Sequence, residues 1–108
     1  LEFQYTARAS YALNKAFGAP IGKAFGITVG APAGIGVVLA DTAVKAATVD
    51  VIGYASPAGG TSYSNEVISF LSGDSGAVRQ AIIAAREVGI PLLGALGAKP
   101  ESTTTPYI

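Results

Sequence analysis

Apolar residues recur along the chain either at every second position or three to four positions apart. Residues 1–7 alternate Leu1, Phe3 and Tyr5 with polar positions, which is the period of a half-buried β-strand. Three further strands are predicted over residues 24–31, 49–55 and 66–72, where β-branched and other apolar residues concentrate.

The apolar period changes to that of a helix between the first two strands. Residues 9–17 place Leu13, Ala16 and Phe17 at helical spacing, and Gly18 ends the pattern. A short helix is therefore predicted here.

A longer helix is predicted after Pro32, whose missing N–H costs little in the first turn of a helix. Its predicted apolar stripe consists of Val37, Ala40, Val44 and Ala47. On the other side of this helix, Asp41 and Lys45 lie four residues apart, which is the spacing of an ion pair.

A third helix is predicted to start at Asp74 or Ser75 and to run to about Val88, with Gly89 as its C-terminal stop. Its buried residues are expected to be Val78, Ile82 and Ala85, and its exposed ones Arg79, Gln80, Arg86 and Glu87. After Pro91, a further apolar turn or short helix is expected to contain Leu92, Leu93 and Leu96.

The predicted order is strand, helix, strand, helix, strand, strand, helix. From the second strand onward this is a split βαβ unit that lacks its closing strand, and the first strand can supply it. We expect one ferredoxin-like α+β domain, circularly permuted, with helices packed on a mainly antiparallel sheet. The domain is expected over residues 1–100, followed by a polar tail over residues 101–108.

Composition narrows the classes of function. Half of the residues are apolar and only 13% are charged, so some apolar surface is expected to meet another subunit. Seven basic and seven acidic side chains cancel, which argues against nucleic-acid partners. No uninterrupted apolar stretch reaches the roughly 20 residues of a membrane-spanning helix.

The chain contains neither Cys nor His. It therefore lacks the usual general base near neutral pH, the cysteine nucleophile and the common transition-metal ligands. We expect no metal and no cofactor. The carboxylates are scattered, and capping and solvation explain them better than catalysis does.

The glycine-rich segment GAPAGIG, residues 30–36, follows a strand and opens a helix, where backbone N–H groups can hold a phosphate. It lacks the Lys and Ser/Thr of a P-loop and does not match the dinucleotide fingerprint. Close packing of the helix on the sheet accounts better for these glycines.

Two segments carry a family resemblance: ADTAVKAATVDVIGY, residues 40–54, and SNEVISFLSGDSGAVRQAIIAAREVGI, residues 64–90. Together they resemble the bacterial microcompartment shell domain, in particular shell proteins that carry two permuted domains in tandem. The resemblance implies a structural subunit of a shell in the bacterial cytoplasm that tiles edge to edge and performs no catalysis. It also implies homo-oligomers, a hexamer or, with tandem domains, a trimer, and as partners other shell proteins and encapsulated enzymes.

The resemblance also assigns candidate site residues. From spacing alone Lys45 is a solvated partner of Asp41, whereas in the family the matching lysine lies at the edge between tiles. The loop SPAGGTSYSN, residues 56–65, matches the segment that approaches the symmetry axis. Its pore candidates are Gly59, Gly60, Thr61, Ser62 and Ser64. Such a lining suits small polar solutes, and the resemblance implies that these are metabolites such as 1,2-propanediol, glycerol or aldehydes.

The alternative interpretation is a small-metabolite-binding or regulatory module, because ferredoxin-like oligomers host many functions. A discrete dimer with a stoichiometric ligand would favour that module, and rings or sheets would favour the shell subunit. An enzyme ranks third, since its base would be a carboxylate or lysine with no evident partner.

Overall fold

The computed structural model describes residues 1–56 and 65–95. In chain order, the elements are β1 (Glu2–Thr6), α1 (Tyr11–Phe17), β2 (Ala24–Gly30), α2 (Ala33–Ala46), β3 (Asp50–Ala55), β4 (Val67–Gly73) and α3 (Ser75–Ala95). The predicted order of strands and helices is confirmed. The predicted end of the domain at residue 100 and the tail over residues 101–108 lie outside the described residues.

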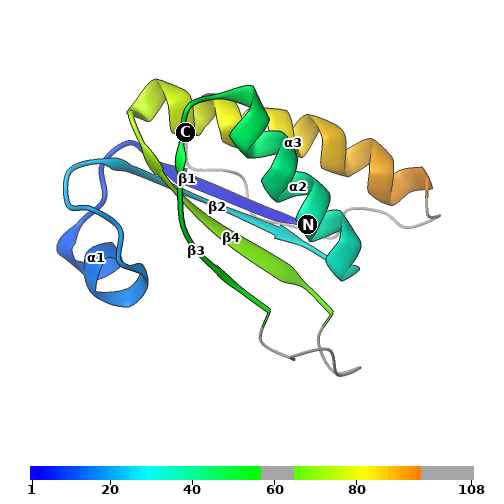
Figure 1. The fold of residues 1–108 in the computed structure, drawn as a ribbon, viewed down its shortest axis with the longest axis horizontal. Coiled ribbons are helices and arrows are strands. Elements are labelled where there is room, and N and C mark those ends of the chain that lie inside the picture. Colours follow the sequence, from blue (N-terminus) through cyan, green and yellow to red (C-terminus); the bar gives the residue numbers. More distant parts are fainter. Residues whose placement is uncertain (57–64, 96–108) are drawn as a thin grey trace.

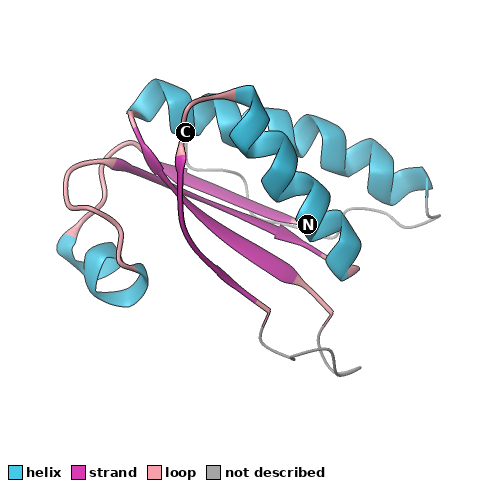
Figure 2. Ribbon diagram, in the orientation of Figure 1, coloured by secondary structure: helices cyan, strands magenta, loops and turns pink. Residues whose placement is uncertain are grey.

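The four strands form one antiparallel sheet in the order β1-β2-β4-β3. The helices α2 and α3 lie side by side on one face, and α1 lies apart from them at one end of the sheet (Figures 1 and 2). Strand β1 precedes the β2-α2-β3-β4-α3 unit in the chain yet pairs with β2, so it is the closing strand of that unit. The permuted α+β fold is therefore confirmed.

The main core lies between the sheet and the pair α2 and α3. It contains Phe3, Tyr5, Ala24, Ile35, Leu39, Ala43, Leu71, Val78, Ala81, Ile82, Ala85 and Leu93. Phe3 and Tyr5 come from alternate positions of β1, as the strand pattern predicts. The hydroxyl of Tyr5 donates a hydrogen bond to the carbonyl oxygen of Ser75 at 3.0 Å, which ties the edge strand β1 to the start of α3.

Close contact between α2 and the sheet depends on two glycines, as predicted for the segment 30–36. A Cβ at Gly30 would lie 2.4 Å from the backbone nitrogen of Gly36. A Cβ at Gly36 would lie 2.6 Å from Cβ of Val67 on β4. Because real Cβ atoms never approach this closely, a side chain at either position would push the helix off the sheet.

The predicted apolar stripe of α2 is wrong. The buried residues of α2 are Ile35, Gly36, Leu39 and Ala43, whereas Val37 is 58% and Val44 is 38% exposed. The segment is apolar nearly all round, so period alone allows more than one stripe. The face that contains Gly36 is the one that packs, because only that face can approach β2 and β4 closely.

The predicted stop of the third helix at Gly89 is also wrong, because α3 continues through Gly89 and Pro91 to Ala95. Gly89 is buried, and a Cβ there would lie 2.6 Å from Cδ2 of Leu39, so this glycine serves the contact between α3 and α2. Burial of Leu93 one turn later stabilises the extension against the proline. Leu92 and Leu93 therefore belong to α3, and Leu96 lies outside the described residues.

The short helix α1 forms where predicted but buries none of its residues. Leu13 is half-buried, while Ala16 and Phe17 are exposed. The side-chain amide of Asn14 donates to the carbonyl oxygen of Ala19 at 2.9 Å and fastens the turn that follows the helix. Thus α1 is held at its ends while its apolar side chains are incompletely covered.

Candidate functional site

The C-terminal turn of α2 carries the predicted ion pair. Nζ of Lys45 lies 2.6 Å from Oδ2 of Asp41, and the two side chains are 73% and 56% exposed. An exposed pair at this spacing contributes only about 0.3–0.5 kcal/mol. The ion pair is confirmed, and the role of Lys45 at an edge between subunits stays a prediction.

The connection between β3 and β4 is fixed at its base. The hydroxyl of Ser56 donates to the carbonyl oxygen of Glu66 at 3.0 Å. The backbone N–H of Ala33, at the start of α2, donates to Oδ1 of Asn65 at 3.3 Å. These bonds hold both ends of the connection beside the N-terminus of α2.

The five pore candidates in this connection lie outside the described residues. They are Gly59, Gly60, Thr61, Ser62 and Ser64. The described ends of β3 and β4 that flank this segment lie at the end of the sheet opposite the C-terminal end of α2 (Figure 1).

An exposed apolar surface is shared by α2 and β3. We call it the α2–β3 surface and define it by Val37 and Val44 on α2 and Val51 and Tyr54 on β3. Their exposed fractions are 58%, 38%, 52% and 76%. Val37 and Val44 are two helical turns apart and share one stripe.

Val51 and Tyr54 face the same side of the sheet although they are three residues apart. The register of β3 on β4 shifts between Val51 and Gly53, and this bulge restores the common face. Both residues pair with buried residues of β4, Val51 with Leu71 and Tyr54 with Ser69. They therefore point to the helix side of the sheet, past the edge of α2.

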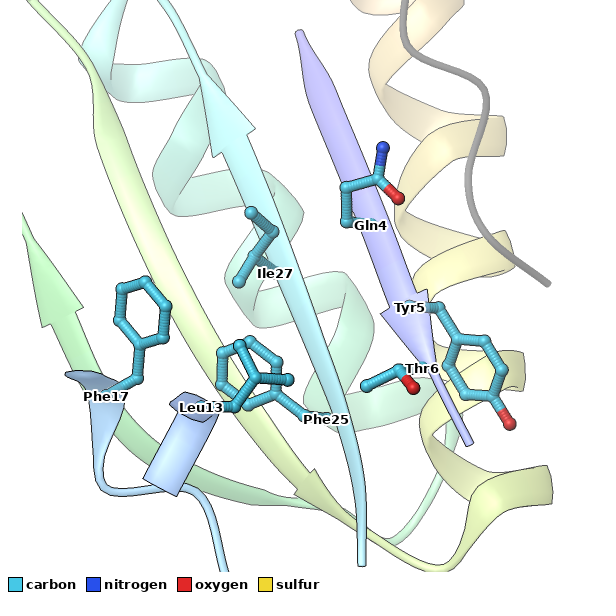
Figure 3. Close-up of a pocket in the computed structure, with 7 residues that line it drawn as sticks. All are labelled: Gln4, Tyr5, Thr6, Leu13, Phe17, Phe25 and Ile27. Carbon is cyan, nitrogen blue, oxygen red and sulfur yellow. The ribbon is translucent and has the colours of Figure 1, made fainter. Parts of the chain in front are cut away.

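A groove lies on the opposite face of the sheet, between α1 and strands β1 and β2 (Figure 3). Its volume is about 290 Å³, and Leu13, Phe17, Phe25 and Ile27 form most of its wall. The rings of Phe17 and Phe25 stack with centroids 5.6 Å apart. Gln4 and Thr6 of β1 complete the groove, while Tyr5 points away from it toward α3 (Figure 3).

Further exposed apolar residues surround α1. Tyr11 is 67%, Phe17 is 42% and Ile21 is 62% exposed. We call these three residues the α1 surface. Large apolar side chains that gather on a surface mark contacts with other molecules.

Sequence reasoning missed both apolar surfaces. The apolar composition indicated that some surface would be covered by another subunit, but it did not locate that surface. Val37 and Val44 were assigned to the buried stripe of α2, so their exposure was not predicted, and neither was that of the aromatics before β2. The bulge lies between Val51 and Gly53, and the isolated glycine inside the strand is the sequence signal that could have predicted it.

Within residues 1–56 and 65–95, no three or more carboxylates are grouped so that they could hold a metal ion. None of the helices described is both long and apolar enough to cross a membrane. The features that the described chain brings together are surfaces for contact: an exposed ion pair, two apolar patches and the fixed base of a loop.

A family model for the BMC domain matches residues 24–98. Over its whole length the chain is 64% identical to the bacterial microcompartment shell protein PduB of Citrobacter freundii, and it covers 40% of that protein. The chain thus spans less than half the length of the relative.

Two of the solved structures that resemble the fold are at least 50% identical to this chain. The chain matches EtuB from Clostridium kluyveri with a TM-score of 0.87 and 53% identity, over 99% of this chain and 47% of EtuB. It matches a trimeric bacterial microcompartment shell protein PduB with a TM-score of 0.85 and 50% identity, again over 99% of this chain and 47% of the other. In each case the chain resembles about one half of the longer protein.

Proposed function

The chain belongs to the BMC domain family, and from this premise we propose that it is a structural subunit of a bacterial microcompartment shell. Copies associate side by side into closed rings, and the rings tile edge to edge. The proposal assigns no chemical step to the chain. It locates the chain in the shell of a compartment in the bacterial cytoplasm, with other shell proteins and encapsulated enzymes as partners.

One observation carries the proposal: the whole described domain superposes on about half of a shell protein solved as a trimer, at a TM-score of 0.85 and 50% identity. Three copies of a protein with two such domains place six domains in a ring. Single domains of this chain can occupy the same six places if one pair of surfaces serves every contact.

The subunit count tests the proposal directly. Native mass spectrometry of the purified 108-residue chain is expected to give a closed hexamer, and negative-stain microscopy of the same sample is expected to give rings or flat sheets. A discrete dimer that binds one metabolite per subunit would overturn the shell function in favour of a binding module. A chain that stays monomeric at high concentration would also contradict assembly by this domain alone.

We further propose that the β3–β4 connection lines an opening in the ring. Its base is held by the hydrogen bonds from Ser56 to Glu66 and from Ala33 to Asn65, which support a defined point of departure. Hydroxyl and backbone groups of Thr61, Ser62 and their neighbours would replace water around a small diol, glycerol or an aldehyde as it passes.

A blocking substitution tests the opening. Ser62→Trp is expected to slow entry of substrate into intact compartments, because the bulky ring narrows the path. Gln80→Trp, on the exposed face of α3, is the matched control and should leave entry unchanged. Equal flux through both variants would remove this loop from the path.

We propose Lys45 as the contact between neighbouring rings. Its ammonium group is 73% exposed at the end of α2, and its ion pair with Asp41 is too weak to require it for folding. Lys45→Ala is expected to abolish sheets while rings persist, as seen by microscopy. Arg86→Ala, which removes an exposed charge from α3, should leave sheets intact.

A further inference from the structure

The groove beside α1 has walls that the folded chain fixes in place. Before α1, the backbone N–H of Ala9 donates to the carbonyl oxygen of Lys23 at 2.7 Å. After α1, the side-chain amide of Asn14 donates to the carbonyl oxygen of Ala19 at 2.9 Å. Ala9 and Ala19 are both buried, in one cluster with Phe25 of β2. Both ends of the α1 segment are therefore anchored, and the groove is part of the folded domain.

One wall of the groove is aromatic (Figure 3). The rings of Phe17 and Phe25 stack at an angle of 20°, and Phe70 of β4 lies 5.1 Å from Phe17 between ring centroids. Phe25 is buried, whereas Phe17 is 42% exposed. The planar ring of a ligand can extend such a cluster, because offset aromatic rings attract each other beyond the burial of their area.

The wall formed by β1 is polar. Gln4 and Thr6 stand at alternate positions of this strand and line the groove (Figure 3). The Thr6 hydroxyl donates to the carbonyl oxygen of Arg8 and accepts from the backbone N–H of Arg8, both at 3.5 Å. Bonds of this length are weak, so the hydroxyl can turn toward a polar group of a ligand at little cost.

Two cations adjoin one end of the groove. Thr6 and Phe25 pair across β1 and β2 at this end. Arg8 follows Thr6 by two residues, and Lys23 precedes Phe25 by two. The hydrogen bond from Ala9 to Lys23 holds the two stretches together. Both cationic side chains are exposed, and within residues 1–56 and 65–95 neither forms an ion pair.

The carboxylates near this end of the sheet come from other elements. Asp50 of β3 pairs with Ser72 of β4, whose other partner is Phe25. Neighbouring strands are about 4.8 Å apart, so Asp50 lies about 10 Å from β2. Asp74 precedes α3, which covers the opposite face of the sheet (Figure 1). Glu2 is at the other end of β1. Arg8 and Lys23 therefore give this end of the groove a positive charge.

We propose that the groove binds a small aromatic carboxylate, with its ring against Phe17 and its carboxylate toward Arg8 and Lys23. This binding site is separate from the β3–β4 connection and does not depend on the proposed shell function. The volume of about 290 Å³ suits one ring with a short chain, because pockets for small molecules start at about 300 Å³. An apolar lining with a few polar groups at one side is the usual composition of such pockets.

Isothermal titration calorimetry of the 108-residue chain tests the proposal with hydrocinnamate and its neutral primary amide. Hydrocinnamate is expected to bind with a dissociation constant of about 1 mM or lower. It should bind about fivefold more tightly than the amide, because each exposed cation adds a small attraction. This preference should disappear in 1 M salt, where the Debye length is about 3 Å.

A charge variant tests the two cations. Arg8→Gln with Lys23→Gln is expected to remove the preference for the carboxylate and to leave the affinity for the amide unchanged. The matched control is Arg79→Gln with Arg86→Gln on the exposed face of α3, which removes the same charge and should keep the preference.

Two further variants test the groove itself. Thr6→Trp places a ring in the space of the ligand and is expected to weaken both compounds about tenfold or more, a loss of at least 1.4 kcal/mol. Gln80→Trp on α3 is its control and should bind like the parent. Phe17→Ala removes the exposed aromatic wall and should weaken both compounds about fivefold. Circular dichroism checks that every variant is folded.

Three outcomes would overturn the inference. Equal affinities of the parent for the carboxylate and the amide would mean that the cations select nothing. Unchanged binding by Thr6→Trp and Phe17→Ala would put the binding site elsewhere. A parent that binds neither compound, with a changed subunit count in Thr6→Trp, would assign the groove to a contact between copies. Ring formation by the parent without ligand reports on the shell function separately.

Discussion

The two faces of the sheet differ in how completely one chain covers them. On the face under α2 and α3, the large side chains Leu39 and Leu71 are fully buried, and glycines bring backbones into contact. On the face that carries α1, the short helix buries none of its residues and leaves a groove of about 290 Å³. One face of the sheet is therefore fully covered within a single chain, and the face that carries α1 is only partly covered.

This difference separates folding from assembly. The covered face supplies most of the stability of the isolated domain, because burial of apolar area is the main favourable contribution to folding. The partly covered face and the β3 edge retain exposed apolar residues that only a second molecule can cover. Substitutions on the covered face should change the free energy of unfolding. Substitutions on the partly covered face or at the β3 edge should change contacts between subunits.

The largest effect is expected from Gly30→Ala. The new Cβ would lie 2.4 Å from the nitrogen and 2.5 Å from the Cα of Gly36, and backbone atoms cannot move aside as a flexible side chain can. We expect a loss of more than about 3 kcal/mol of unfolding free energy, measured by urea denaturation. Gly34→Ala on α2 is the control, because open space surrounds its Cβ, and it should be neutral or stabilising. Equal stability of both variants would contradict the close contact of α2 with β2.

The next test compares one large side chain from each face. Leu39→Ala removes a fully buried side chain beneath α3 and is expected to cost about 3 kcal/mol. Phe17→Ala removes a ring that is 42% exposed, and it should cost about 1 kcal/mol. Thermal melts at one protein concentration measure both, since assembly makes the melting temperature depend on concentration. A larger loss for Phe17→Ala would mean that the face with α1 is part of the folding core.

Thr28 is a poorly satisfied residue on the otherwise well-packed, covered face of the sheet. It is fully buried in β2, and its hydroxyl has no hydrogen-bond partner among the described residues. Thr28→Val keeps the shape, removes the unsatisfied group and is expected to stabilise the domain by about 1 kcal/mol. In the control Thr6→Val, the replaced hydroxyl accepts a bond from the backbone N–H of Arg8, so no gain is expected. A loss of stability in Thr28→Val would reveal a partner for the hydroxyl.

Much of the fold was predictable because local patterns and tertiary structure agree. Alternation in residues 1–7 and the apolar strands after Lys23 predicted all four strands and the permuted order. The errors concern the choice among several apolar faces. On α2 the sequence offers two stripes, and the contact of Gly36 with Val67 selects the stripe that contains this glycine. On α3, packing against Leu39 overrides the stop signal at Gly89.

The candidate site was predictable only where it depends on local spacing. A spacing of four residues on a helix was enough to predict the ion pair of Asp41 with Lys45. The exposure of Val51 and Tyr54 depends on a bulge and on the absence of a helix above β3, which are properties of the whole sheet. Family resemblance supplied the interpretation of Lys45 and of the loop, and the geometry of single residues could not have done so.

The smallest stability effect is expected at the ion pair itself. A double-mutant cycle with Asp41→Ala, Lys45→Ala and the double variant should give a coupling free energy below about 0.5 kcal/mol, and it should vanish in 1 M salt, where the Debye length is about 3 Å. The reason is solvent: both side chains are more than half exposed. Because this coupling is close to zero, Lys45→Ala separates stability within the chain from contacts between chains. Any larger change that it causes in sheet formation must then arise between molecules. A coupling above about 1 kcal/mol would make the lysine part of the folded domain's own stability and would remove the basis for assigning it to the tile edge.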